Sequence, residues 1–184
     1  MAQQWYCPSC GEDVDTLSIM KNGVESISCS NCGLTLNKKK KIKTLKSVML
    51  VEDTPAILKK VAEMLLVREI ASTVIPCEHG EVFLEKTISR MRKNEPISLI
   101  ILDINMPILN GVNAAIAWRS VERALQFGKK VPIIFFSANK CNEDFKKVLQ
   151  YCAPAHYINK GSGSNPEDFA GRLYDVISVF LEGN

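Results

Sequence analysis

The 184-residue sequence lacks any run of eighteen apolar residues, and its start, MAQQWYC, has no basic segment followed by an apolar one. These absences argue against a membrane-spanning helix and against a secretory signal. A hydrophobic content of 46% with 23% charged residues is typical of a globular protein. We therefore expect a cytoplasmic protein without membrane insertion.

A large charge excess is also absent, since the net charge is +3. Residues 1–36 carry one Lys against four acids, whereas residues 37–47 carry six Lys and no acid. The stretch NKKKKIKTLK has no Arg, and no aromatic residue that could stack on a base. We favour a solvated, self-repelling linker at residues 37–46, with nucleic-acid binding through clustered Lys as the alternative.

The seven cysteines do not fit a disulfide framework, because their number is odd and no export signal precedes them. Four of them form C-x2-C, eighteen residues, and C-x2-C, which is the spacing of a four-thiolate zinc site. The predicted ligands are Cys7, Cys10, Cys29 and Cys32. Four thiolates fill a tetrahedral shell, so we expect a structural zinc with no position for a catalytic water.

Residues 1–36 are predicted to form a zinc ribbon. Gly11 and Gly33 each follow a CxxC pair, where a turn with positive φ brings backbone N–H groups toward the sulfurs. Between the pairs, TLSIM and VESIS flank Asn22-Gly23, which favours a two-residue hairpin turn. About 36 residues bury too little apolar surface to fold alone, so the metal would replace a core.

From residue 47 onward, apolar runs alternate with helical patterns, which predicts a parallel sheet covered on both faces. We expect one α/β domain over residues 47–184 with a flavodoxin-like (βα)5 sheet in strand order 2-1-3-4-5. The strands are predicted in VMLV, STVI, ISLIIL, VPIIFF and HYI. The helices are predicted at residues 55–68, 80–92, 111–127, 142–152 and 166–181.

Polar residues follow four of these strands, and in that order the four strands are neighbours. In an open parallel sheet, ligands bind beyond the carboxyl ends of the strands. The residues at these ends are Glu52, Asp53, Asp103, Ser137 and Lys160. Three carboxylates close together need a cation, and an all-oxygen ligand set favours Mg²⁺. A metal-bound Asp103 could then attack a phosphoryl group, with Lys160 and Ser137 contacting the phosphoryl oxygens.

Residues 47–184 resemble the receiver domain of two-component response regulators, of the chemotaxis-Y-like type. VEDTP, LDINMPILNG, FFSAN and HYINKG stand in that family's order and spacing. The resemblance implies Asp103 as the phosphoacceptor, with Lys160 as the phosphate counter-ion. It implies Mg²⁺ ligands at Glu52, Asp53, Asp103 and the backbone carbonyl of Asn105. It also implies Ser137 and Tyr157 as switch residues, and Gly161 departs from it because a Pro commonly follows the lysine.

The resemblance also implies a bacterial or archaeal source and particular partners. A histidine kinase or a histidine phosphotransfer protein would donate the phosphate. No output domain is expected after the last helix, so the signal would pass to a protein bound at the face of helix 4, strand 5 and helix 5, or through the ribbon. A homodimer and a phosphorylation-controlled nucleic-acid regulator are open alternatives.

We do not expect an enzyme beyond self-phosphorylation and autodephosphorylation. Aspartyl phosphohydrolases usually carry a second Asp two residues after the nucleophile, and here that position is Asn105, which cannot transfer the proton. We expect no nucleotide site, because neither GxGxxG nor a P-loop follows the first strand. The other Cys and His residues are assigned to packing or to no function: Cys77, His79, Cys141, Cys152 and His156.

Overall fold

The computed structural model describes residues 5–21, 23–37, 43–126, 128–161 and 166–181. Residues 38–42 of the predicted linker at 37–46 therefore lie outside the described residues. Leu45, near the linker's end, pairs with the segment that precedes residue 74: its N–H donates to Ile70 O, and its carbonyl accepts from Ser72 N–H. None of the helices in the described part of the chain is both long enough and apolar enough to cross a membrane.

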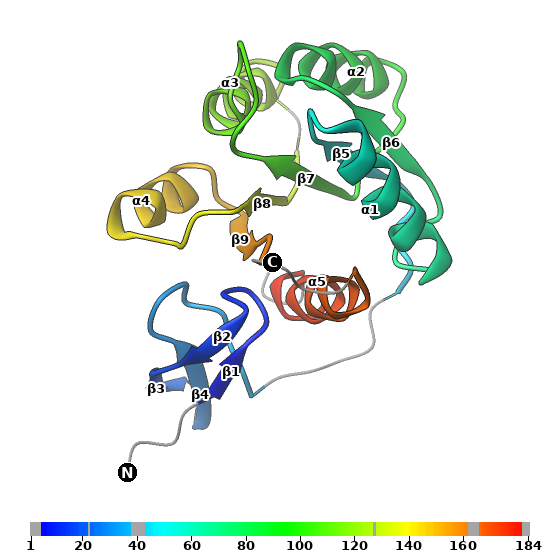
Figure 1. The fold of residues 1–184 in the computed structure, drawn as a ribbon. Coiled ribbons are helices and arrows are strands. Elements are labelled where there is room, and N and C mark those ends of the chain that lie inside the picture. The colour runs from blue at the N-terminus through cyan, green and yellow to red at the C-terminus, as the bar shows by residue number, and fades with distance from the viewer. Residues whose placement is uncertain (1–4, 22, 38–42, 127, 162–165, 182–184) are drawn as a thin grey trace.

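Five parallel strands form the main sheet in the order β6-β5-β7-β8-β9 (Figure 1). This is the flavodoxin-like order that the sequence predicted, with the second strand at one edge. Their bounds are β5 (Val48–Val51), β6 (Val74–Cys77), β7 (Leu99–Asp103), β8 (Ile133–Ser137) and β9 (Ala155–Asn159). Every residue of β5, β7 and β8 is buried, as expected of strands covered on both faces.

Helices cover both faces of this sheet (Figure 1). They are α1 (Pro55–Val67), α2 (Gly80–Arg92), α3 (Gly111–Ala124), α4 (Glu143–Tyr151) and α5 (Pro166–Phe180). Helices α1 and α5 contact each other on one face, and α2 contacts α3 on the other. The side chains of Asn110 and Asn142 cap α3 and α4 by accepting hydrogen bonds from backbone N–H groups in the first turn.

A buried arginine fastens α3 to the segments that precede β8 and β9. Arg119 is 1% exposed, forms an ion pair with Glu122, and donates to the carbonyls of Val131, Cys152 and Pro154. Glu122 in turn accepts from Val131 N–H at 2.8 Å. Each buried charge therefore has a partner, which is the condition under which a buried ion pair is tolerated.

Residues 5–37 contribute a small β module, which we call the cysteine module. Two antiparallel hairpins form it: β1 (Trp5–Cys7) with β2 (Glu12–Val14), and β3 (Thr16–Lys21) with β4 (Val24–Cys29). Lys21 pairs with Val24, so the predicted two-residue connection at 22–23 is present, although residue 22 itself lies outside the described residues. Gly11, Gly23 and Gly33 have φ near +77°, as the sequence predicted for Gly11 and Gly33.

Candidate functional site

Three carboxylates meet at the carboxyl end of the sheet. Glu52 follows β5, Asp53 comes next in the chain, and Asp103 is the last residue of β7. One oxygen from each lies within 4.8 Å of the others. Glu52 and Asp103 are only 1% and 2% exposed, whereas Asp53 is partly exposed. The structure therefore brings together the three acids that the sequence placed at strand ends, with one side open to solvent.

Lys160 supplies positive charge to this cluster from the residue after β9. Its Nζ lies 2.7 Å from Glu52 Oε2 and 3.1 Å from Asp103 Oδ1, and 4.6 Å from the centre of the Phe136 ring. Burial raises the pKa of the Glu52 carboxyl above its ordinary value, and the ion pair with Lys160 opposes that shift. The lysine thus partly balances charges that burial makes costly.

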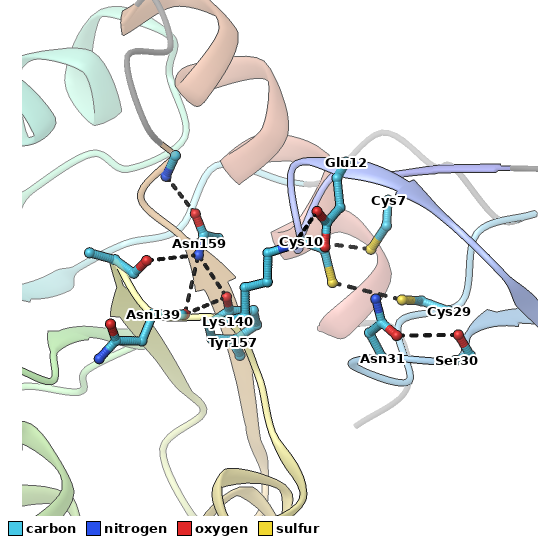
Figure 2. Close-up of polar contacts among 12 residues, drawn as sticks. Cys7, Cys10, Glu12, Cys29, Ser30, Asn31, Asn139, Lys140, Tyr157 and Asn159 are labelled. Carbon is cyan, nitrogen blue, oxygen red and sulfur yellow. Dashed lines mark hydrogen bonds and ion pairs between the residues drawn. The ribbon is translucent and has the colours of Figure 1, made fainter.

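Ser137 connects the carboxylate cluster to the loop that leads into α4. The Asn139 backbone N–H donates to Ser137 Oγ at 3.0 Å, and Lys160 N–H donates to Ser137 O at 2.7 Å. Tyr157 Oη donates to Asn139 O at 2.7 Å and accepts from Asn159 Nδ2 at 2.9 Å (Figure 2). Burial raises the pKa of Tyr157 to about 12. The two predicted switch residues therefore contact the same residue, Asn139.

Two loops complete the site. The Asn105 backbone N–H donates to Asp103 Oδ1 at 3.3 Å, so Asn105 lies beside the acid. Gly161 has φ of +78°, and its N–H donates to Asn159 Oδ1 at 2.7 Å. A proline could do neither, because its φ is fixed near −65° and it has no N–H. The loop after Lys160 therefore has a backbone conformation that a proline could not adopt.

The four cysteines of the CxxC pairs gather in the cysteine module, with their Sγ atoms within 4.8 Å of one another. Cys7 and Cys32 Sγ are 3.6 Å apart, and Cys10 and Cys29 Sγ are 3.8 Å apart, so the sulfurs are not joined as disulfides. The Cys10 backbone N–H points at Cys7 Sγ at 3.5 Å (Figure 2). The Cys32 backbone N–H points at Cys29 Sγ, also at 3.5 Å.

The donor sets fit the two metals that the sequence suggested. Zn–S bonds of about 2.3 Å in a tetrahedron place sulfurs about 3.8 Å apart, close to the two measured distances. The sulfurs hydrogen-bond to one another, which lowers the pKa of Cys29 and Cys32 and raises that of Cys10, so a bound cation would be needed for all four to be thiolates. At the other site, clustered carboxylate oxygens suit a hard cation such as Mg²⁺.

The cysteine module lies against β9, α4 and α5 (Figure 1). Asn159 N–H donates to Ser9 O at 2.8 Å, and Ser9 Oγ donates to the Tyr157 carbonyl. Arg172 of α5 donates to Pro8 O at 2.9 Å and to Asn159 O at 2.7 Å. Sequence reasoning predicted no contact between the two parts of the chain.

Sequence reasoning missed Ser9 and Arg172, and it assigned no function to His156. Arg172 is 6% exposed and occupies a position of the apolar stripe formed by Phe169, Leu173, Val176, Ile177 and Phe180, so a cation within that stripe was a usable signal. His156 lies among the buried residues, its Nε2 has no hydrogen-bond partner among the described residues, and its ring packs 5.7 Å from that of Phe180. Together with Cys32, it lines a groove between module and sheet.

The remaining cysteines were predicted to be packing residues, and their surroundings agree with that prediction. Cys77 and Cys152 are fully buried. Burial raises the pKa of the Cys77 and Cys141 thiols to about 11, so neither is a thiolate at neutral pH. His79 precedes α2 as its N-cap residue and makes no side-chain cap bond.

Comparisons with known proteins agree with this geometry. The family model described as the response regulator receiver domain matches residues 48–166. No curated protein matched the sequence.

Several solved structures share the fold at low sequence identity. The receiver domain of the histidine kinase CKI1 from Arabidopsis thaliana, complexed with Mg²⁺ and BeF3⁻, has a TM-score of 0.58 and 23% identity, covering 74% of this chain and 90% of that chain. The Vibrio cholerae chemotaxis protein CheY4 has a TM-score of 0.55 and 22% identity, covering 72% and 98%. A CheY-like receiver protein from Methanospirillum hungatei has a TM-score of 0.55 and 21% identity, covering 76% and 99%.

Proposed function

Because the chain belongs to the response regulator receiver domain family, we propose that it accepts a phosphoryl group on Asp103 from a histidine kinase or a histidine phosphotransfer protein. The observation that carries this proposal is the position of Asp103. It is buried at the end of β7, beside two further carboxylates and within 3.1 Å of Lys160 Nζ. This arrangement combines a nucleophile with groups that stabilise a phosphoryl anion.

The proposed transfer is a displacement at phosphorus. A carboxylate oxygen of Asp103 forms an O–P bond while the P–N bond of the phosphohistidine breaks, and the imidazole nitrogen leaves with the electron pair and takes up a proton. Lys160 would turn from Glu52 to an oxygen of the transferred group. The Ser137 hydroxyl would donate a hydrogen bond to another oxygen.

Two metals belong to this proposal. Glu52, Asp53, Asp103 and the carbonyl of Asn105 would hold Mg²⁺, which supplies positive charge beside the phosphoryl oxygens when bound. The four clustered cysteines would hold a structural zinc and make the module a zinc ribbon. The carboxylate oxygens suit a hard cation and the thiolates a softer one, so the two sites select different ions.

The product is proposed to persist as a signal because no acid stands two residues after the nucleophile. Asn105 stands two residues after the nucleophile, where a hydrolase needs a group that can donate and accept a proton. Water attack on the aspartyl phosphate would therefore lack general acid and base assistance. This favours a phosphoprotein switch in a two-component signalling pathway over a phosphohydrolase.

Incubation with acetyl phosphate and Mg²⁺ tests the proposal. We expect the wild-type protein to gain one phosphoryl group, with acetate released as Asp103 attacks phosphorus. Asp103→Asn should gain none, because an amide is not a nucleophile at neutral pH. Intact mass and peptide mapping after borohydride trapping provide the measurement. Asp144→Asn, which changes an exposed acid on α4, is the matched control and should label like wild type.

The outcomes separate the hypotheses. Phosphate on wild type and Asp144→Asn but not on Asp103→Asn supports a phosphoacceptor. If the wild-type protein gains no mass with acetyl phosphate and Mg²⁺, the proposal is wrong. If Asp103→Asn is phosphorylated as much as wild type, the acceptor is another residue.

A further inference from the structure

The edge of the main sheet at β9 is covered by the chain's own cysteine module. As the last strand in the order β6-β5-β7-β8-β9, β9 has one row of backbone groups that no strand of the sheet pairs. Ser9 of the module bonds to two of these groups, the Tyr157 carbonyl and the Asn159 N–H. Ser9 is fully buried in this contact, so the pairing excludes water.

Arg172 ties the same contact to α5. Its guanidinium donates to the carbonyls of Pro8, Ser9 and Asn159, and it packs against Gly11, where an added Cβ would lie 2.8 Å from Arg172 Nη2. The guanidinium therefore packs directly against the tight turn that follows the first CxxC pair. An arginine bonded to three carbonyls, two of them from the module, is an anchor of the contact.

Lysine side chains on the receiver side contact the acidic cysteine module. Lys140, in the loop before α4, lies 2.6 Å from Glu12 (Figure 2). Lys146 of α4 donates to Ser30 O at 3.4 Å. Residues 1–36 carry four acids against one Lys. The module thus fits the α4-β9-α5 face in backbone pairing and in charge.

The contact is connected to the carboxylate site through Asn139. Its N–H donates to Ser137 Oγ, and its carbonyl accepts from Tyr157 Oη and Asn159 Nδ2. Its neighbour Lys140 pairs with Glu12 of the module. If the Ser137 hydroxyl turns toward a phosphoryl group on Asp103, Asn139 N–H loses its acceptor, and the loop that carries Lys140 must adjust.

We propose that the α4-β9-α5 face binds the chain's own cysteine module while Asp103 is unmodified, and that phosphorylation of Asp103 releases the module. This inference rests on the proposed phosphoacceptor function. The module is then an internal competitor for the face through which a downstream protein would bind. Phosphorylation frees the β9 edge and Arg172 together, and also the surface of the module that contacts them.

Linkage makes the proposal quantitative. Occupancy of the carboxylate site and docking of the module oppose each other in this proposal. As long as most molecules are docked, a substitution that weakens docking must therefore increase the affinity for a phosphoryl mimic by the same factor. Ser9→Ala removes one buried hydrogen bond and leaves the Tyr157 carbonyl unpaired. We therefore expect beryllofluoride with Mg²⁺ to bind Ser9→Ala about fivefold to tenfold more tightly than wild type.

The matched control is Ser18→Ala, which deletes the same hydroxyl at an exposed position of the module, where it bonds to Glu25. Its beryllofluoride affinity should equal that of wild type. An unchanged affinity for Ser9→Ala, or an equal change in both variants, overturns the inference.

Hydrogen exchange of the Asn159 amide, measured by NMR on the metal-loaded full chain, reports docking directly, because this N–H is held by Ser9 O. Beryllofluoride with Mg²⁺ should speed its exchange at least about tenfold in wild type and leave it unchanged in Asp103→Asn. Phosphate uptake from acetyl phosphate, followed by mass, is read separately. Uptake without faster exchange overturns the release and leaves the phosphoacceptor function standing, whereas no uptake overturns both.

Discussion

Replacing Cys7 with serine should unfold the cysteine module and leave the receiver sheet folded. Among the described residues of the module, the buried apolar side chains besides the cysteines are Val14 and Leu34, which is too little to fold 33 residues. Zinc binding to four cysteines contributes about 10 to 16 kcal/mol to folding of such modules. A serine hydroxyl is a poor zinc ligand at neutral pH, so most of this free energy is lost.

Metal analysis and hydrogen exchange measure the effect. Wild-type protein should carry about one zinc per chain, and Cys7→Ser should carry much less. In Cys7→Ser the amides of residues 5–37 should lose their protection against hydrogen exchange, whereas those of β5, β7 and β8 should keep it. Cys141→Ser is the matched control, because Cys141 lies outside the cluster and should keep both the zinc and the protection. A protected module in metal-free Cys7→Ser would contradict a zinc ribbon.

Periodicity and turn signals in the sequence predicted the main sheet well. Strand β5 and helix α2 have the predicted bounds. Strand β6 was predicted at 72–75 and lies at Val74–Cys77, because its register is set by pairing with β5, where Val48 lies opposite Val74. The strand also includes Pro76, which lacks an N–H and is tolerated because β6 is at the edge of the sheet.

The grouping of the carboxylates was predictable, whereas the docking of the module was not. Acids at the ends of parallel strands meet wherever strand order makes the strands neighbours, so Glu52 and Asp103 could be placed together from the chain order alone. The bond between Arg172 and the Pro8 carbonyl joins positions 164 residues apart and involves a backbone acceptor, which no residue pattern marks. Contacts of this kind depend on the shapes of two folded surfaces.

Gly111→Ala should be the most damaging change near the carboxylate site that adds no charge. An ideal Cβ at Gly111 would lie 2.0 Å from the backbone oxygen of Asp103 and 2.9 Å from its carbonyl carbon. No side-chain rotation relieves a clash with backbone, and Gly111 N–H is also bonded to Ile104 O at 3.0 Å. We expect a loss of at least about 3 kcal/mol in the free energy of unfolding, since forced overpacking must shift α3 or β7.

Urea denaturation compares this variant with Gly171→Ala, a matched change inside α5 where an added Cβ meets no heavy atom within 4 Å. The control should be as stable as wild type or up to about 1 kcal/mol more stable, because alanine favours a helix interior. Any Gly111→Ala protein that stays folded should label with acetyl phosphate more slowly, since the shifted backbone carries the Asp103 carboxylate. Equal stability of the two variants would show that α3 moves away from β7 without cost, and the close approach at Gly111 would then have no part in positioning the nucleophile.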